Sequence, residues 1–183
     1  MNFGFIFINV FFSIVIIVGL IVIWWVWPPD SPWSLWWRTN GKKALAAIKL
    51  ADIGSDDKVF ELGSGDATFL VTCAKKVGAK CVGIEIDYIR HIIATFNAML
   101  NGVSSKVELR HGNFFDYKLN SATVVFAYLV PSVLEKLKPK LFSELKKGTR
   151  IISYRYKFKI KKGDKMKYIG SDTRSQMHFY KIT

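Results

Sequence analysis

The hydrophobic and polar positions of this 183-residue chain form two distinct patterns. The first is an apolar run, Phe3 to Trp27, that contains no charged residue and only Asn9 and Ser13 as clearly polar ones. As a helix this run would be about 37 Å long, which exceeds the roughly 30 Å of a bilayer's hydrocarbon core. We therefore expect residues 1–27 to form a transmembrane helix, residues 28–50 a juxtamembrane segment with a lead-in helix, and residues 51–183 a folded domain.

The second pattern alternates short apolar runs with helical periodicity and predicts an α/β domain with a doubly wound sheet. The expected strands are Lys58–Leu62, Cys81–Ile86, Lys106–Arg110, Ala122–Leu129 and Gly148–Tyr154, followed by an antiparallel closing pair, Lys165–Ile169 and Gln176–Ile182. The expected helices are Ala67–Val77, Asp87–Leu100 and Pro131–Leu145, the last of them broken at Pro139.

A glycine-rich segment joins the first expected strand to the first expected helix, and it reads V-F-E-L-G-S-G-D-A-T-F-L from Val59 to Leu70. Gly63 and Gly65 allow a sharp turn and a close approach of the backbone to a ligand. Glu85 would stand at the carboxyl end of the second strand, where a carboxylate can accept hydrogen bonds from ribose hydroxyls. This layout is typical of a nucleoside cofactor site. The alternative is an ordinary glycine turn of an α/β protein.

Two positions favour S-adenosylmethionine over a dinucleotide. The dinucleotide fingerprint has a third glycine where this chain has Thr68. Glu61, two residues before the first glycine, would face a pyrophosphate unfavourably but could bind the ammonium of a methionine moiety through water. Glu61 and Glu85 together therefore indicate a zwitterionic ligand that bears a sulfonium.

These residues resemble motif I of the class I S-adenosylmethionine-dependent methyltransferases, E/D-x-G-x-G-x-G. Ala67 stands where a third glycine is usual, so we expect the entry to the helix to differ slightly. The segment from His111 to Phe114 resembles the part of the family that contacts adenine. The resemblance implies a Rossmann-like, doubly wound, seven-stranded sheet with an antiparallel last strand. It also implies a cofactor site made of Glu61, Gly63, Ser64, Gly65, Asp66, Glu85, Ile86, Asn113 and Phe114.

The end of the fourth expected strand is where this fold places residues that face the acceptor. The chain lacks the N-P-P-Y type motif of enzymes that methylate nucleobase or glutamine nitrogens. Instead, the membrane helix, the short domain and the Val130-Pro131 pair resemble the small membrane-anchored protein-lysine methyltransferases that modify the ATP synthase c subunit and the adenine nucleotide carrier. This resemblance implies a lysine of a membrane protein as acceptor. We expect Tyr128 to orient the amine and Pro131 and Ser132 to shape its channel, although Tyr128 is equally explained as a core aromatic residue.

The apolar run favours a retained membrane anchor over a cleaved signal peptide. No lysine or arginine precedes it, it is too long for a signal core, and no small-residue cleavage site follows it. All six tryptophans lie between Trp24 and Trp37, which is typical of a membrane interface. Lysines and arginines after residue 37 then predict an outside N-terminus and a catalytic domain in the cytoplasm or an equivalent organellar compartment.

The net charge of +13 predicts an anionic partner. Arg155 to Lys167 alone holds seven basic residues and one acid. Anionic lipid and nucleic acid would both be attracted, but the apolar run favours the lipid surface. Cys73 and Cys81 have no metal or redox spacing, and the three histidines are too scattered to indicate a metal site.

Several functions therefore stay open on sequence alone. A membrane-anchored lysine methyltransferase is the first. A methyltransferase for a lipid or lipophilic small molecule is the second, because the anchor would serve either acceptor. A non-catalytic protein that keeps the fold as a scaffold is the third, and an RNA methyltransferase, disfavoured by the anchor, is the fourth.

Overall fold

The computed structural model describes the backbone of residues 3–26 and 39–183, with the side chains of residues 4–23 and 39–183. The chain divides into two compact units, residues 1–36 and 37–183. The first unit contains helix α1, Phe3–Val26, in which Gly4–Ile23 is long and apolar enough to cross a membrane. None of the side chains in that stretch is buried within the protein. The predicted tryptophan belt lies outside the described side chains.

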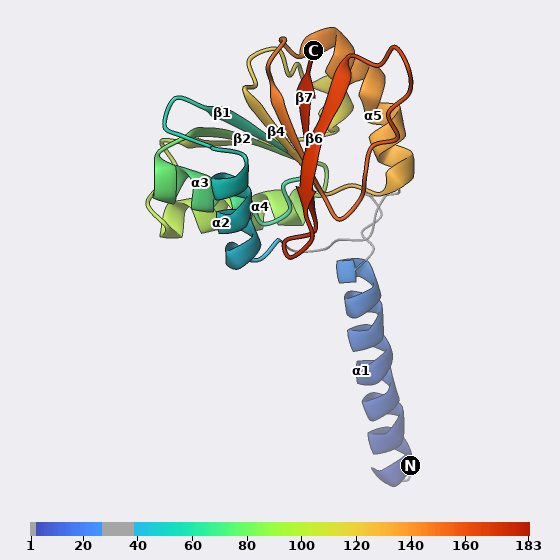
Figure 1. Ribbon diagram of the computed structural model, residues 1–183. Coiled ribbons are helices and arrows are strands. Elements are labelled where there is room, and N and C mark those ends of the chain that lie inside the picture. Colours follow the sequence, from blue (N-terminus) through green and yellow to red (C-terminus); the bar gives the residue numbers. More distant parts are fainter. Residues whose placement is uncertain (1–2, 27–38) are drawn as a thin grey trace. The chain divides into compact units, whose positions relative to one another are not determined.

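The second unit is built on a seven-stranded sheet in the order β3-β2-β1-β4-β5-β7-β6 (Figure 1). The first five strands in the sequence are parallel, and β7 is antiparallel to both of its neighbours, β5 and β6. The predicted α/β, doubly wound, seven-stranded fold is thus confirmed. The strands are β1 Lys58–Leu62, β2 Lys80–Glu85, β3 Val107–His111, β4 Val124–Ala127, β5 Arg150–Tyr154, β6 Met166–Asp172 and β7 Met177–Ile182.

Helices cover both faces of the sheet and bury two separate apolar layers. Helices α2 (Gly41–Leu50), α3 (Thr68–Val77) and α4 (Tyr88–Leu100) share one layer, to which they contribute small and aromatic side chains such as Ala47, Phe69 and Ala94. Helix α5 (Pro131–Glu144) packs on the other layer through its leucines. Figure 1 shows α2, α3 and α4 gathered on one side of the sheet and α5 on the other.

Two predicted elements differ from the structure. Helix α5 is continuous from Pro131 to Glu144, so the predicted break at Pro139 is wrong. Proline removes one hydrogen-bond donor from a helix, and here it stands at an exposed position, where water can satisfy the carbonyl that loses its partner. Strand β4 is Val124–Ala127, shorter than the predicted Ala122–Leu129. The apolar run is longer than the strand because residues beyond the last strand pair, such as Leu129, are still buried.

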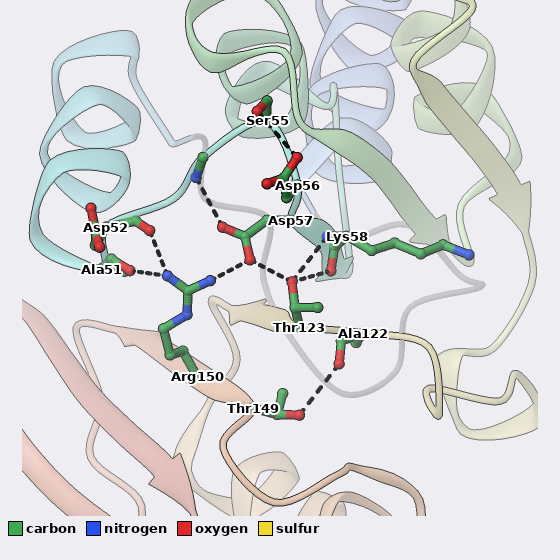
Figure 2. Close-up of polar contacts among 11 residues, drawn as sticks. Ala51, Asp52, Ser55, Asp56, Asp57, Lys58, Ala122, Thr123, Thr149 and Arg150 are labelled. Carbon is green, nitrogen blue, oxygen red and sulfur yellow. Dashed lines mark hydrogen bonds and ion pairs between the residues drawn. The ribbon is translucent and has the colours of Figure 1, made fainter.

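A polar cluster connects the end of helix α2 to the edge of the sheet at which the parallel strands begin (Figure 2). The guanidinium of Arg150 donates to the carbonyl oxygens of Ala51 and Asp52, just after α2, and to the carboxylate of Asp57. Thr123 also donates to Asp57, at 2.6 Å. Burial alone would raise the pKa of Asp57, but hydrogen bonds from Thr123, the Gly54 N–H and Arg150 outweigh burial and lower it. This cluster is structural and lies away from the predicted cofactor loop.

Candidate functional site

The carboxyl ends of the parallel strands bring most of the predicted site residues to one edge of the sheet. Leu62 pairs with Ala127, so the segments that follow β1 and β4 begin side by side. Glu85 pairs with His111, so the ends of β2 and β3 are also adjacent. The glycine loop, the acid after β2 and the segment after β3 therefore meet where open α/β sheets bind ligands.

The glycine loop turns back over the end of β2 through left-handed backbone conformations. Gly63 and Gly65 have φ angles of +76° and +54°, which side chains disfavour. The N–H groups of Gly63 and Ser64 both donate to the Ile84 carbonyl, at 2.9 and 3.1 Å. Ala67 also has a positive φ, +57°, so the position of the family's third glycine keeps a glycine-like backbone.

Glu85 connects this loop to the start of α4. Its two carboxylate oxygens accept hydrogen bonds from the N–H of Gly65, at 2.7 Å, and the N–H of Asp87, at 3.0 Å. Burial raises the pKa of Glu85, and these two hydrogen bonds oppose the shift. Because an ionised carboxylate has about four acceptor positions, both oxygens keep capacity for further donors such as ribose hydroxyls.

Glu61 is the penultimate residue of β1 and has only 5% of its surface exposed. Its Oε2 is buried without a hydrogen-bond partner among the described residues, and so is the hydroxyl of Ser64. Burial, aided by the nearby negative charge of Asp66, raises the pKa of Glu61 well above its ordinary value. A buried acceptor without a partner destabilises a protein unless a ligand or water supplies a donor. The residues present therefore fit a ligand that carries a cation or hydrogen-bond donors.

The remaining predicted cofactor residues line the same edge. Asp66 is buried, its carboxylate accepts from the Thr68 N–H at 3.1 Å, and its carbonyl accepts from Asn97 at 2.7 Å. The carbonyl of Ile86 lies 3.0 Å from His111 Nε2. Asn113 caps a 3₁₀ turn, Phe114–Asp116, and the half-buried Phe114 ring lies 4.7 Å from the ring of Phe115.

The three residues predicted to face the acceptor lie beyond the end of β4. The ring of Tyr128 packs at 4.4 Å from that of Tyr154 at the end of β5, and Pro131 and Ser132 form the exposed first turn of α5. Leu129 approaches the glycine loop, since a Cβ at Gly63 would lie 3.7 Å from its Cδ2. The predicted acceptor residues and the predicted cofactor loop are therefore neighbours.

Sequence reasoning missed two residues at this edge, Tyr154 and Arg155. Tyr128 hydrogen-bonds to Arg155 and raises the pKa of its guanidinium. Burial raises the pKa of Tyr154, and Tyr128 adds to this shift. The rule that singled out Tyr128, a polar residue at the carboxyl end of a parallel strand, would also have found Tyr154.

Metal and thiol chemistry receive no support from the part of the chain with described side chains. No group of three or more His, Cys, Asp or Glu residues in that part is placed to hold a metal ion. Cys73 and Cys81 are buried free thiols. A hydrogen bond with Cys81, together with burial, raises the pKa of Cys73, so its reactive thiolate is suppressed.

Comparison with known families places these features in context. The family described as "ANTKMT methyltransferase domain" matches residues 61–165. A protein-lysine N-methyltransferase of Saccharolobus islandicus is 40% identical over 122 residues, which are 66% of this chain and 76% of the relative. An adenine nucleotide translocase lysine N-methyltransferase of Mus musculus is 32% identical over 104 residues, 56% of this chain and 45% of the relative. The chain spans only about a third of the ribosomal protein L11 methyltransferases that it also matches.

One solved structure is similar over most of the chain. An RNA methyltransferase from Salinibacter ruber, in complex with S-adenosyl-L-homocysteine, is 34% identical with a TM-score of 0.69. The similarity covers 80% of this chain and 93% of the solved one. S-adenosyl-L-homocysteine is the demethylated form of the methyl donor that the sequence predicted.

Proposed function

The chain belongs to the ANTKMT methyltransferase domain family, and we propose that it N-methylates lysine in a membrane protein while anchored in the membrane by α1. It is an S-adenosylmethionine-dependent enzyme of the protein-lysine methyltransferase family. The choice of a membrane protein as acceptor, the anchoring and the roles of individual residues are the parts that we propose.

The observation that carries the cofactor assignment is the pair of buried acids. Bound S-adenosylmethionine would supply an electrophilic methyl group on a sulfonium. Glu85 would accept hydrogen bonds from its ribose, while Glu61 and Ser64 would satisfy their unpartnered oxygens with its ammonium, directly or through water. Asn113 and Phe114 would contact the adenine, together with Ile86.

The acceptor amine would enter between the ends of β4 and β5. A lysine has an ordinary pKa of about 10.4, so its neutralisation at pH 7 costs roughly 5 kcal/mol. A positive charge within a few ångströms lowers that cost, because it disfavours the protonated amine. Arg155, held beside Tyr128, would act in this way, and the Tyr128 hydroxyl would orient the neutral amine. Pro131 and Ser132 would border the channel.

The membrane location rests on the length and composition of α1, and a signal sequence would meet the same criteria. The lysines that follow favour an outside N-terminus and a catalytic domain on the cytoplasmic side, or the equivalent side of an organelle. A lysine of a membrane protein close to the bilayer surface would then be within reach of the catalytic edge.

A methyl-transfer assay tests the proposal. The full chain would be incubated with radiolabelled S-adenosylmethionine and with an unfractionated lysate of cells that lack the enzyme, followed by separation of membrane protein, soluble protein, lipid and RNA. Glu85→Gln serves as the variant with impaired cofactor binding, and Glu108→Gln, at an exposed position of the neighbouring strand β3, serves as the matched control.

We expect label in a membrane protein band, recovered as methyl-lysine, strongly reduced with Glu85→Gln and kept with Glu108→Gln. Label in the lipid fraction would show that the methyl acceptor is a lipid or another lipophilic molecule and not a lysine. Label in RNA would favour the activity named for the Salinibacter ruber protein. Methyl-lysine confined to soluble proteins would contradict the membrane part of the proposal alone.

A further inference from the structure

The helices on one side of the sheet contain no acidic residue. None of the helices α2, α3 and α4 includes an aspartate or a glutamate. They carry five lysines and one buried arginine, Arg90, and four of the lysines are exposed: Lys42, Lys49, Lys75 and Lys76. The opposite helix α5 contains Glu135 and Glu144, which pair with lysines of the same helix. The absence of acids is therefore a property of the three helices on one side of the sheet.

The same side exposes large apolar side chains in a continuous row. Ile89, Phe96 and Leu100 follow one another along α4 at spacings of seven and four residues, which places them on one face of the helix. Phe96 is 59% exposed and Leu100 is 87% exposed. Met99 on α4 and Leu45 and Leu50 on α2 are exposed as well. A surface helix of a soluble protein normally carries polar residues at such positions.

We propose that this acid-free face, the exposed side of α2, α3 and α4, binds the surface of an anionic lipid bilayer. Apolar side chains among lysines, without acids, are the composition of helices that lie at a lipid interface. The apolar row enters the boundary between headgroups and acyl chains, and the lysines contact lipid phosphates.

The connection to α1 supports a bilayer as the occupant rather than a soluble partner. Helix α1 ends at Val26 and α2 begins at Gly41, so residues 27–40 form the link. Fourteen extended residues reach at most about 50 Å. An α1 inserted in a membrane therefore keeps α2 within about 50 Å of the bilayer, so weak lipid contacts become effectively intramolecular. This inference rests on the proposed membrane location but not on the choice of methyl acceptor.

A second basic region could also bind an anionic lipid surface, but its composition is less suited to it. The loop that ends near Lys165 carries exposed lysines but also Asp164, which pairs with Lys138 at 2.8 Å. Glu135 accepts from the backbone N–H of Lys159 in the same loop, at 3.0 Å. The loop thus packs against acidic groups of α5, whereas the exposed residues of the acid-free face are lysines, apolar residues and a few neutral polar residues such as Thr95.

The test uses the full chain in lipid nanodiscs with an environment-sensitive fluorophore on Phe96→Cys. The two native thiols are buried, which favours labelling at the new position. Ser143→Cys, exposed on α5, is the control site. Binding of S-adenosyl-L-homocysteine verifies that each labelled variant is folded.

In nanodiscs with phosphatidylglycerol we expect a blue-shifted emission from position 96 and several-fold stronger quenching by nitroxide lipids than from position 143. Replacing Lys42, Lys49, Lys75 and Lys76 with glutamine should reduce this quenching to the level in pure phosphatidylcholine. The matched replacement of Lys161, Lys162, Lys165 and Lys167 should leave most of it.

Three results would overturn the inference. The first is water-like emission from position 96 on nanodiscs that retain the chain. This result would contradict the inference but not the proposed membrane anchor. The second is the reverse order of the two lysine sets. The third is a blue shift that needs no lipid and grows with protein concentration, which would assign the face to a second copy of the chain. Absence of the chain from the nanodisc fraction would overturn both this inference and the proposed membrane location.

Discussion

The carboxylate of Glu85 accepts a hydrogen bond of 2.7 Å from the backbone N–H of Gly65, twenty residues earlier in the chain. The bond closes the glycine loop onto the end of β2. Its acceptor is also the group that the sequence predicts to hold the ribose. Glu85 therefore shapes the loop as well as offering its remaining acceptor capacity to a ligand.

Replacing Glu85 with glutamine should weaken cofactor binding by about tenfold to a hundredfold. Glutamine has the shape of glutamate, but one end is a donor and would oppose either the Gly65 or the Asp87 N–H. Hydrogen bonds to a charged group contribute about 1.5–3 kcal/mol each. Titration calorimetry with S-adenosyl-L-homocysteine measures the effect. Equal affinities of Glu85→Gln and the surface control Glu108→Gln would contradict this role of Glu85.

Glu61 should make the cofactor-free protein less stable as the pH rises. Its folded pKa is raised by burial, so between its ordinary pKa of about 4.3 and the folded value the native state binds more protons than the unfolded state. The stabilisation is full below the ordinary pKa and is lost as the pH passes through the folded one. Glu61→Gln stays neutral, so its stability relative to the natural protein should increase with pH. Thermal unfolding across this range measures the difference, and parallel curves would refute it.

Alanine in place of Gly83 in β2 should destabilise the domain. A Cβ there would lie 2.7 Å from Leu70 Cδ1, 2.8 Å from Leu109 Cδ2 and 2.9 Å from Ser64 Oγ. Overpacking of this kind typically costs about 1–3 kcal/mol. Gly170→Ala in β6 is the control, because a Cβ there has no neighbour within 4 Å. Urea unfolding should show a loss for Gly83→Ala alone, and comparable midpoints would mean that the core absorbs the methyl group without cost.

Tyr128→Phe should lower kcat by about tenfold and leave cofactor affinity unchanged. The variant keeps the ring that packs on Tyr154 but loses the hydroxyl that contacts Arg155. Steady-state kinetics at several pH values would separate orientation of the amine from its deprotonation. Tyr168→Phe, on the edge strand β6, is the control. An unchanged kcat would assign Tyr128 to packing.

Arg150→Met should destabilise the domain by about 1–3 kcal/mol without altering cofactor affinity, because it removes donors from Asp57 and from the end of α2. The pKa of Asp57 is lowered in the folded state, so its contribution is present above the ordinary pKa of about 3.9 and is lost as the pH falls. The variant should therefore lose less of its stability on acidification. Chemical unfolding at two pH values measures both effects, with Arg174→Met, at an exposed position, as the control.

Much of the fold could be predicted from the sequence because its signals are local. The parallel strands appear as apolar runs, and the glycine loop appears as two glycines between a strand and a helix. Predicted ends of elements shifted by one or a few residues, as at β4, because burial continues where the ladder stops. The predicted helix break at Pro139 is wrong for a related reason. The destabilisation caused by a proline depends on whether the helix faces water at that point.

The candidate cofactor residues were also accessible to sequence reasoning, since strand ends and glycines mark the carboxyl edge. Only the tertiary structure decided which groups lie together and which acceptors lack a partner. Three features depend on elements that are far apart in the sequence. They are the lack of a partner for Glu61 Oε2, the contact of Tyr128 with Arg155, and the acid-free face. Periodicity along one segment reports which side of that segment is buried. The partner across the sheet, and the exposure that remains after packing, are set by the arrangement of the elements in space.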